Sequence, residues 1–559
     1  MVRIPTMWRA VSRLLRTMTV AGVVLSLDSA GLSANEPIAA DKLQPATPVP
    51  GALVIGGGGL LPDSVIDRFF ELGEGPNAKI VIITTASQLA GTDDIKVRFE
   101  RWMTRKFQSL TYLHTRDRDE ANRPEFSHCL TEATAVWFAG GNQNLVTEAY
   151  RDTLVERRCH EVLKRNGVVG GTSAGAAIMS RTMIAGGVTT PTIAPGLAFL
   201  PGTIVDQHFA ARNRQDRLMH ALENHPGHVG FGVNECTALV VRGRTLEVVG
   251  DQDVTICLGP TESKPARIES LPVGKKEDLI RLSRAAIGRR VASKANTASR
   301  RPEVTKGTLV IAGVGPTPAE AVSKFFNAAG GKTSSIVLLS AMGKEDDEFE
   351  ASFSDCLKAV GAANVRQVRA SDPSELNGEK LKEVLSDATG VWIAGSQISR
   401  MVESYLDAPV HAMFADVLRR GGAIGGTSAG AAMQGEFLVD DGIPDNNTYI
   451  AEGYDRGFGF LPGVAIGQPQ NHHENFDDMT VFKKSYPELV GLEVPEATAL
   501  IVSGTTMEVV GKNPVSVYDR KPDDPESQPF VEVVKAGQSY DFKHRRRVDV
   551  IRTETAQAK

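Results

Sequence analysis

An internal repeat constrains the fold of this chain more than any other feature of its sequence. Four short motifs occur twice in the same order: GALVIGGG and GTLVIAG, KIVIITTAS and SIVLLSA, AVWFAG and GVWIAG, VGGTSAGAA and IGGTSAGAA. Further along both copies, FLPG at Phe199 recurs at Phe460, and TALVV at Thr237 recurs, at the same spacing, as TALIV at Thr498. Such ordered self-similarity predicts two copies of one domain.

Each copy alternates short apolar runs, rich in Val and Ile, with longer amphipathic stretches such as Pro62 to Leu72 and Leu145 to Leu163. Strands that are buried on both faces and joined by crossover helices have this pattern. We therefore expect two tandem α/β domains with mostly parallel central sheets. The expected divisions are a first domain over 51–260, a linker over 261–306, a second domain over 307–521 and a polar tail over 522–559.

The linker and the tail are expected to hold little regular structure. The linker is rich in Lys, Arg, Ser and Pro, and we expect one helix in it, from Glu277 to Ala295. In the tail, Phe530 to Val534 would add an edge strand.

The composition excludes several classes of protein. Of 559 residues, 42% are hydrophobic and 23% charged, which is typical of a globular protein, and a net charge of -5 gives no reason to expect a nucleic acid partner. The five cysteines have no C-x-x-C spacing, so the sequence predicts neither a metal site nor a dense disulfide framework, and it leaves the disulfide state open. No organic cofactor is implied.

Residues 1–34 have the order of a secretory signal peptide. Arginines precede a short apolar run, about Met18 to Leu27, and small residues follow near Ala34. The apolar run is shorter than the roughly 20 residues of a membrane-spanning helix. We expect a secreted or periplasmic protein with no membrane segment in its mature form; the alternative is a basic amphipathic helix that is retained.

The strongest chemical signal is the stretch VVGGTSAGAA, in which a predicted strand meets a predicted helix. A serine on such a turn is pushed out of the top of the sheet, and Gly171 and Gly175 leave room for the tight backbone. Ser173 is therefore the candidate nucleophile. Glycine-rich turns also serve tight packing or phosphate binding, and those alternatives stay open for the motif taken alone.

Two backbone amides are candidates for an oxyanion hole. Ala174 opens the helix after the serine, where the helix dipole favours negative charge. Gly141 lies in AGGNQ, directly after the predicted strand 135–138, and is the second candidate.

A serine nucleophile needs a base, and the base needs a group that orients it. His208 lies in VDQHFAARNRQDRL, and Glu235 directly precedes the apolar run TALVV. Taken alone, His208 would more often be an ordinary histidine, but the residues around it are unusually charged: Asp206, Gln207, Arg212, Arg214 and Arg217.

Three motifs, GGTSAGA, AGGNQ and DQHF-x-x-R-x-R-x-x-R-L, together resemble the cyanophycinase branch of a serine peptidase family that also contains aspartyl dipeptidase. The resemblance covers nearly all of 51–260 and, more faintly, 307–520. It implies a three-layer α/β fold like that of class I glutamine amidotransferases and a catalytic set of Ser173, His208 and Glu235. It also implies substrate-pocket positions at Gln143, Asp206, Gln207, Arg212, Arg214 and Arg217.

The resemblance implies a substrate as well: cyanophycin, a polyaspartate whose side-chain carboxyls carry arginine, cleaved to β-aspartyl-arginine. Arginine side chains suit the free carboxylates of such a unit, and Asp206 would meet its guanidinium. The alternatives are a peptidase acting on small aspartyl peptides and a non-catalytic protein that binds peptide or polymer.

The second copy is degenerate at the matching positions. It keeps Ser428 and Glu496, but Pro469 stands where the first copy has His208. We therefore expect a poor nucleophile there and a structural role, with the two domains forming an internal pseudo-dimer, or a polymer-binding role. His472 and His473 are alternatives as a displaced base or as metal ligands.

Overall fold

The computed structural model describes most of both repeats. The described residues are 45–261, 264–291, 301–340, 344–369, 379–395, 397–406, 410–439, 452–467, 478–520 and 530–549. The expected signal peptide, 1–34, lies outside them. Among the described residues, no helix has both the length and the apolar character of a membrane span.

The first domain is built on an eight-stranded mixed sheet in the order β14-β11-β10-β1-β5-β4-β2-β3. The strands β1, β5, β4, β2 and β3 are parallel neighbours, and β10, β11 and β14 continue the sheet antiparallel. Their bounds are β1 Val49–Gly56, β2 Lys79–Ile83, β3 Ser109–Leu113, β4 Ala135–Phe138, β5 Val168–Thr172, β10 Thr237–Gly243, β11 Thr245–Gly250 and β14 Lys276–Asp278.

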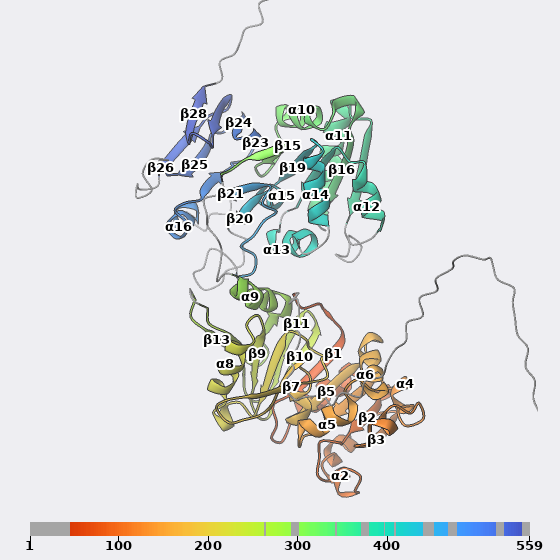
Figure 1. The fold of residues 1–559 in the computed structure, drawn as a ribbon. Helices are drawn as coiled ribbons and strands as arrows, with labels where there is room; N and C mark the ends of the chain where they lie inside the picture. Colours follow the sequence, from red (N-terminus) through yellow and green to blue (C-terminus); the bar gives the residue numbers. More distant parts are fainter. Residues whose placement is uncertain are drawn as a thin grey trace, which may run out of the picture. The chain divides into compact units, whose positions relative to one another are not determined.

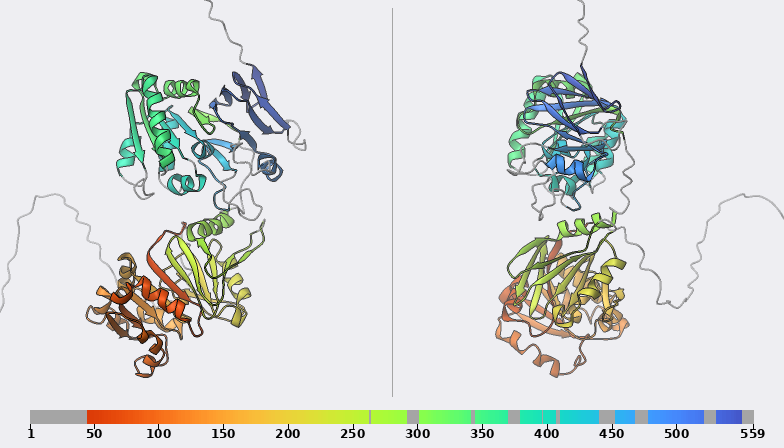
Figure 2. Two further views of the ribbon diagram at one scale, coloured as in Figure 1. Left: turned by 180° about the vertical axis from the view of Figure 1, so that it is seen from behind. Right: turned by 90° about the vertical axis from the view of Figure 1, so that its left-hand side faces the viewer.

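Side chains on the two faces of this sheet enter two separate cores. Along β1, Leu53 and Ile55 belong to one core, whereas Ala52 and Val54 belong to the other, because successive side chains of a strand point to opposite faces. The domain therefore has three layers, which are visible within each domain in Figures 1 and 2. The helices of the first domain are α1 Asp63–Leu72, α2 Asp94–Val97, α3 Arg118–Ala121, α4 Cys129–Glu132, α5 Gln143–Tyr150, α6 Leu154–Lys164, α7 Ala174–Ala177, α8 Gln215–Asn224 and α9 Leu279–Val291.

A smaller sheet and a hairpin complete the first domain. The sheet has the order β13-β12-β9-β8, in which β8 and β9 are parallel. The bounds are β8 Thr203–Gln207, β9 Val229–Val233, β12 Val254–Leu258 and β13 Arg267–Leu271, and the hairpin consists of β6 Thr182–Gly186 and β7 Thr192–Pro195.

The second domain repeats this plan. Its main sheet has the order β17-β16-β18-β19-β15-β23-β24-β27-β28, and its smaller sheet has the order β20-β21-β22-β25-β26. Ile311 pairs with Leu500 as Ile55 pairs with Leu239, so the two domains share a strand register. The structure thus confirms two tandem α/β domains with mostly parallel central sheets.

The strands of the second domain are β15 Val304–Ala312, β16 Ser335–Ser340, β17 Asn364–Arg369, β18 Gly390–Ala394, β19 Ala423–Thr427, β20 Gly435–Leu438, β21 Leu461–Gly467, β22 Val490–Glu493, β23 Thr498–Gly504, β24 Thr506–Gly511, β25 Val515–Asp519, β26 Phe530–Val534, β27 Gln538–Asp541 and β28 Arg546–Asp549. Its helices are α10 Ala319–Ala328, α11 Lys344–Ala359, α12 Glu379–Ser386, α13 Ile398–Met401, α14 Val410–Arg419, α15 Ala429–Ala432 and α16 Asp478–Ser485.

The expected linker and polar tail both contain strands of the domains before them. β13 pairs with β12, and β14 pairs with β11, so the first sheet system continues past residue 260. In the tail, β26 is the expected edge strand, and β27 and β28 extend the main sheet. The sequence concealed β13 and β14 because they are short, charged and half exposed, as edge strands commonly are.

Candidate active site

The candidate nucleophile, Ser173, lies on a strained turn between β5 and α7. Its φ of 54° and ψ of -109° fall in a region that a residue with a side chain rarely adopts. Its backbone N–H donates to the carbonyl of Gly56 at 3.0 Å, which ties the turn to the end of β1. The turn therefore presents the hydroxyl at the carboxyl end of the parallel strands, as the sequence predicted.

Two glycines of the turn are required by close packing of the backbone. A Cβ built on Gly171 would lie 2.6 Å from the carbonyl oxygen of Gly175, and one on Gly175 would lie 2.2 Å from that of Phe138. Alanine at either position would therefore clash with backbone atoms. This agrees with the expectation that both glycines leave room for the turn.

Three predicted residues form a continuous chain of hydrogen bonds. The hydroxyl of Ser173 lies 2.9 Å from Nε2 of His208, and Nδ1 of the same imidazole lies 2.6 Å from Oε1 of Glu235. The histidine side chain is 10% exposed and that of the glutamate 35%. In this arrangement a neutral imidazole donates from Nδ1 to the carboxylate and accepts at Nε2 from the serine.

Tight turns aim the histidine and the glutamate at each other. His208 follows β8 with a φ of 52°, and its N–H donates to the carbonyl of Gly57 at 2.7 Å. Glu235 follows β9, and the next residue, Cys236, has a φ of 58° and donates to the carbonyl of Gly58 at 2.9 Å. The glycine run after β1 is thus the common support of both side chains.

Gly58 is a functional position that the sequence analysis did not identify. A Cβ there would lie 2.2 Å from Cε1 of His208, so only glycine leaves room for the imidazole. The available signal was the run of four glycines at 56–59, which was noted only as part of the repeat. Asn234 was also missed: its Oδ1 accepts from the N–H of Ala210 at 2.9 Å and so braces the turn that follows the histidine.

The electrostatic surroundings keep the imidazole of His208 neutral. Burial is the largest influence and lowers the pKa of His208 below its usual 6.5; the hydrogen bond to Glu235 raises it, and the charge of Arg212 lowers it again. Because only the neutral form can accept a proton, a lowered pKa leaves His208 ready to act as a base at neutral pH.

Both candidate oxyanion donors lie beside the serine. Gly140 is so close to Ser173 that a Cβ on it would be 3.3 Å from the serine Cβ, and Gly141 follows with a φ of 146°. Among the described residues, the N–H groups of Gly141 and Ala174 donate to no backbone carbonyl. Both amides are therefore available to a developing negative charge.

The predicted pocket residues differ in their burial and in their hydrogen-bond partners. Asp206 is fully buried, and its carboxylate accepts from Nε of Arg217 at 2.9 Å and from Nη1 of Arg214 at 3.3 Å. Gln143 donates through Nε2 to the carbonyls of Ile184 and Ala185 at 3.1 and 3.0 Å.

Unlike the fully buried Asp206, Arg212 is exposed, and Arg214 is half-buried, as Gln143 is. Arg214 also donates to the backbone carbonyl of Gln207 at 2.5 Å and to the side-chain oxygen of that residue. Burial, the largest influence, lowers the pKa of Arg214 to about 10, a value that leaves the guanidinium charged at neutral pH. The carboxylate of Asp206, which we expected to meet a substrate guanidinium, instead pairs with protein arginines.

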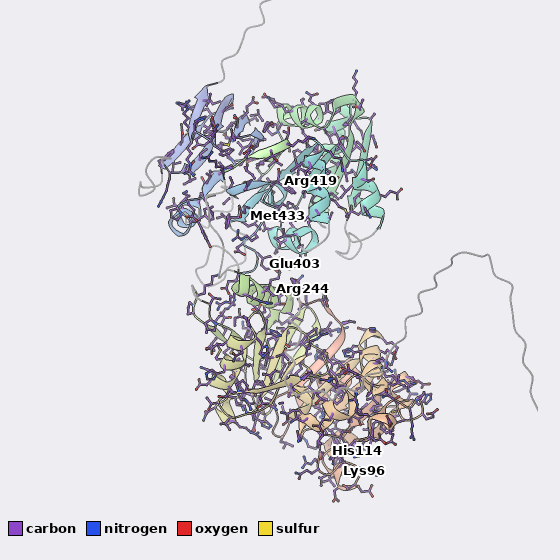
Figure 3. All side chains as sticks on the ribbon, in the orientation of Figure 1. Lys96, His114, Arg244, Glu403, Arg419 and Met433 are labelled. Atoms are coloured by element: carbon purple, nitrogen blue, oxygen red, sulfur yellow. The ribbon has the colours of Figure 1, made fainter. Side chains whose placement is uncertain are left out.

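A second histidine of the first domain lies outside this arrangement. His114 follows β3, at the edge of the sheet, and is labelled in Figure 3. Its Nδ1 lies 3.1 Å from the hydroxyl of Thr85, and burial lowers its pKa. Within the described part of the chain, no group of three or more His, Cys, Asp or Glu side chains is arranged to hold a metal ion.

The second domain keeps the turn but has a valine where the first domain has Gly58. Ser428 has a φ of 52° and a ψ of -123°, close to the values of Ser173. Val314 occupies the place of Gly58: its carbonyl accepts from the N–H of Ala497 at 3.3 Å, as that of Gly58 accepts from Cys236. The two positions differ in backbone conformation, because Gly58 has a φ of 115° whereas the φ of Val314 is not positive.

The matching oxyanion donor of the second domain is already used. The N–H of Ala429, which corresponds to Ala174, donates to the carbonyl of Gly395 at 3.0 Å. Residues 468–477, which include Pro469, His472 and His473, lie outside the described residues. The described part of this site thus lacks one of the two amides that the first domain leaves available to an oxyanion.

Comparison with known proteins places both repeats in one group. The model of Peptidase family S51 matches residues 53–249 and again 315–510. A cyanophycinase of Geminocystis herdmanii is 35% identical over 211 residues, which is 36% of this chain and 76% of that protein. A cyanophycinase of Synechococcus elongatus is 32% identical over 203 residues, which is 34% of this chain and 62% of that protein.

Among solved structures, one similar chain is that of a peptidase from an acI-B1 Actinobacterium. It is 20% identical, the match covers 42% of this chain and 97% of that one, and the TM-score is 0.33.

Proposed function

The chain belongs to peptidase family S51 and is a serine-type peptidase, and from this premise we propose that its first domain hydrolyses cyanophycin to β-aspartyl-arginine. The observation that carries the proposal is the hydrogen-bonded chain from Ser173 through His208 to Glu235. These three hydrogen-bonded side chains lie next to the arginine-rich segment that follows β8.

In the proposed reaction, Oγ of Ser173 attacks the carbonyl carbon of a main-chain amide of the polymer. Its proton passes to Nε2 of His208, and the imidazolium that forms is stabilised by Glu235. The negative charge on the carbonyl oxygen is stabilised by the N–H groups of Ala174 and Gly141.

Three further proton transfers complete the turnover. His208 gives its proton to the leaving nitrogen as the carbon–nitrogen bond breaks, which leaves an ester on Ser173. Water then loses a proton to His208 and attacks the ester carbon, and the serine leaves with that proton. Because the product retains the bond between the aspartate side chain and arginine, the bond that breaks is in the polyaspartate backbone.

The charges near the site favour this substrate class. Each unit of cyanophycin carries the free carboxylate of an arginine, and a guanidinium recognises a carboxylate through paired hydrogen bonds. Arg212 is exposed and lies four residues beyond the histidine, and Arg214 is half-buried beside it. The names of the relatives agree with the same substrate.

We further propose that the protein is exported and that its two domains pair with each other. The order of charged and apolar residues in 1–34 supports secretion or a periplasmic location, where an external polymer would be met. The tandem repeat supports an internal pseudo-dimer in which the second domain takes the place of a partner subunit.

Incubation of the purified protein with cyanophycin, followed by mass analysis of the products, tests the function. We expect β-aspartyl-arginine from the parent protein and none from Ser173→Ala. If the parent released arginine and left the polyaspartate intact, the bond assigned above would be wrong. Cleavage of small aspartyl peptides alone would identify a dipeptidase, and tight binding without turnover would identify a binding protein.

A further inference from the structure

The hairpin β6–β7 is held from both sides by residues that lie beside the candidate active site. On one side, Gln143, two residues after Gly141, uses Nε2 to donate to Ile184 and Ala185 of β6. On the other side, Nη1 of Arg217 donates to the carbonyl of Gly187, at the tip of the hairpin, at 2.6 Å.

The second anchor is rigid because Arg217 is itself clamped. It is 4% exposed, and both Nε and Nη2 donate to the carboxylate of Asp206, two residues before the candidate base. Three nitrogens of the guanidinium are thus engaged by protein groups, and a paired arginine of this kind holds its geometry tightly.

The base of the hairpin and its tip differ sharply in their surroundings. Ile184 and Ile193 pack into a small core with Ile204, Phe209 and Leu218. The tip projects into solvent, and Val188 is 88% exposed, the highest value among the large apolar side chains of the described residues. The hairpin is therefore a fixed arm with an apolar tip, and Gln143 and Arg217 anchor it close to the triad.

We propose that this hairpin is an arm that borders the path of the polymer to Ser173, and that Gln143 and Arg217 are positioning residues for it. Substrate carboxylates are then left to Arg212 and Arg214, while the tip at Val188 contacts polymer beyond the unit being cleaved. This inference rests on the proposed function, which identifies the polymer. The anchoring of the arm is independent of that function.

Hydrogen exchange tests the anchoring without any substrate. Arg217→Lys replaces three donating nitrogens by a single ammonium and so loses the forked pairing with Asp206 that holds the bond to Gly187 in place. Exchange in peptides covering 182–195 should therefore accelerate about tenfold or more, because local opening no longer breaks a charged hydrogen bond of the same strength. Gln143→Ala, which leaves the buried ion pair intact, should act in the same direction. Arg212→Lys, in the same segment but exposed, is the matched control.

The role of the tip is tested by chemical labelling. A bulky maleimide on Val188→Cys should raise KM for cyanophycin severalfold with little change in kcat. The same label on Lys164→Cys is the control, because Lys164 is exposed and precedes the amino end of β5, whereas Ser173 follows its carboxyl end. Labelled parent protein corrects for its native thiols.

Two results would overturn the inference. One is unchanged exchange over 182–195 in both Arg217→Lys and Gln143→Ala; the other is equal kinetics for the proteins labelled at 188 and 164. If the parent released no β-aspartyl-arginine, the proposed function would fail, whereas the exchange experiment would still decide whether the arm is anchored as described.

Discussion

Gly58 lies against the imidazole of His208, so close that a Cβ on the glycine would be 2.2 Å from Cε1 of the ring. In the second domain Val314 occupies the matching position, where its carbonyl bonds to Ala497. The glycine that leaves room for the imidazole in the first domain is therefore absent from the second domain.

Replacing Gly58 by alanine should disable the enzyme by displacing the base. Because a shift of about 1 Å in a reacting group can cost about 100-fold, we expect kcat/KM to fall by at least that factor. Gly274→Ala is the control, since Gly274 also has a positive φ, 76°, but nothing lies within 4 Å of its Cβ position. Equal activity of the two variants would contradict this account of Gly58.

The pH dependence of kcat/KM should report the environment of His208. The protonated imidazole cannot accept a proton, so activity falls as pH drops through its pKa; because burial lowers that pKa, the midpoint should lie below 6.5. Arg212→Ala removes a positive charge that lowers the pKa and should move the midpoint upward. A midpoint that stayed in place or moved down would argue against His208 as the titrating base.

Ser428 should be dispensable. Its neighbour Ala429 already donates to Gly395, and the sequence has Pro469 where the first domain has His208. We expect Ser428→Ala to retain the parent's kcat/KM, whereas Ser173→Ala should lose about six orders of magnitude and reach background. If Ser428→Ala lost activity while its thermal unfolding stayed unchanged, the assignment of the chemistry to the first domain would be wrong.

Asp206 should contribute to stability through its buried pair with Arg217. Asp206→Asn leaves that guanidinium buried without its counter-charge, and breaking such a pair typically costs about 3–5 kcal/mol of unfolding free energy. Asp216→Asn, an exposed change in the first turn of α8, should cost about 0.5 kcal/mol. Urea unfolding followed by circular dichroism compares the two variants, and equal midpoints would rule out a structural role for the pair.

Much of the fold could be predicted because its signals are local. The runs of Val and Ile that form β1, β2, β4 and β5 and the repeat of these runs indicated two α/β domains. The turn at Ser173 was also predictable, since a strand, small residues and a helix follow one another within a few positions. The strands β13 and β14 were missed because charged, half-exposed edge strands resemble a linker.

The sequence by itself determined that two α/β domains follow each other, and it pointed to a serine at a sharp turn, because both properties depend on neighbours along the chain. Only the tertiary structure decided that Gly58 makes room for His208, that the N–H of Ala429 donates to Gly395, and that Arg217 engages Asp206 and Gly187. These relationships join segments that are distant in sequence, so no local pattern records them until the backbone has brought them within van der Waals or hydrogen-bond distance.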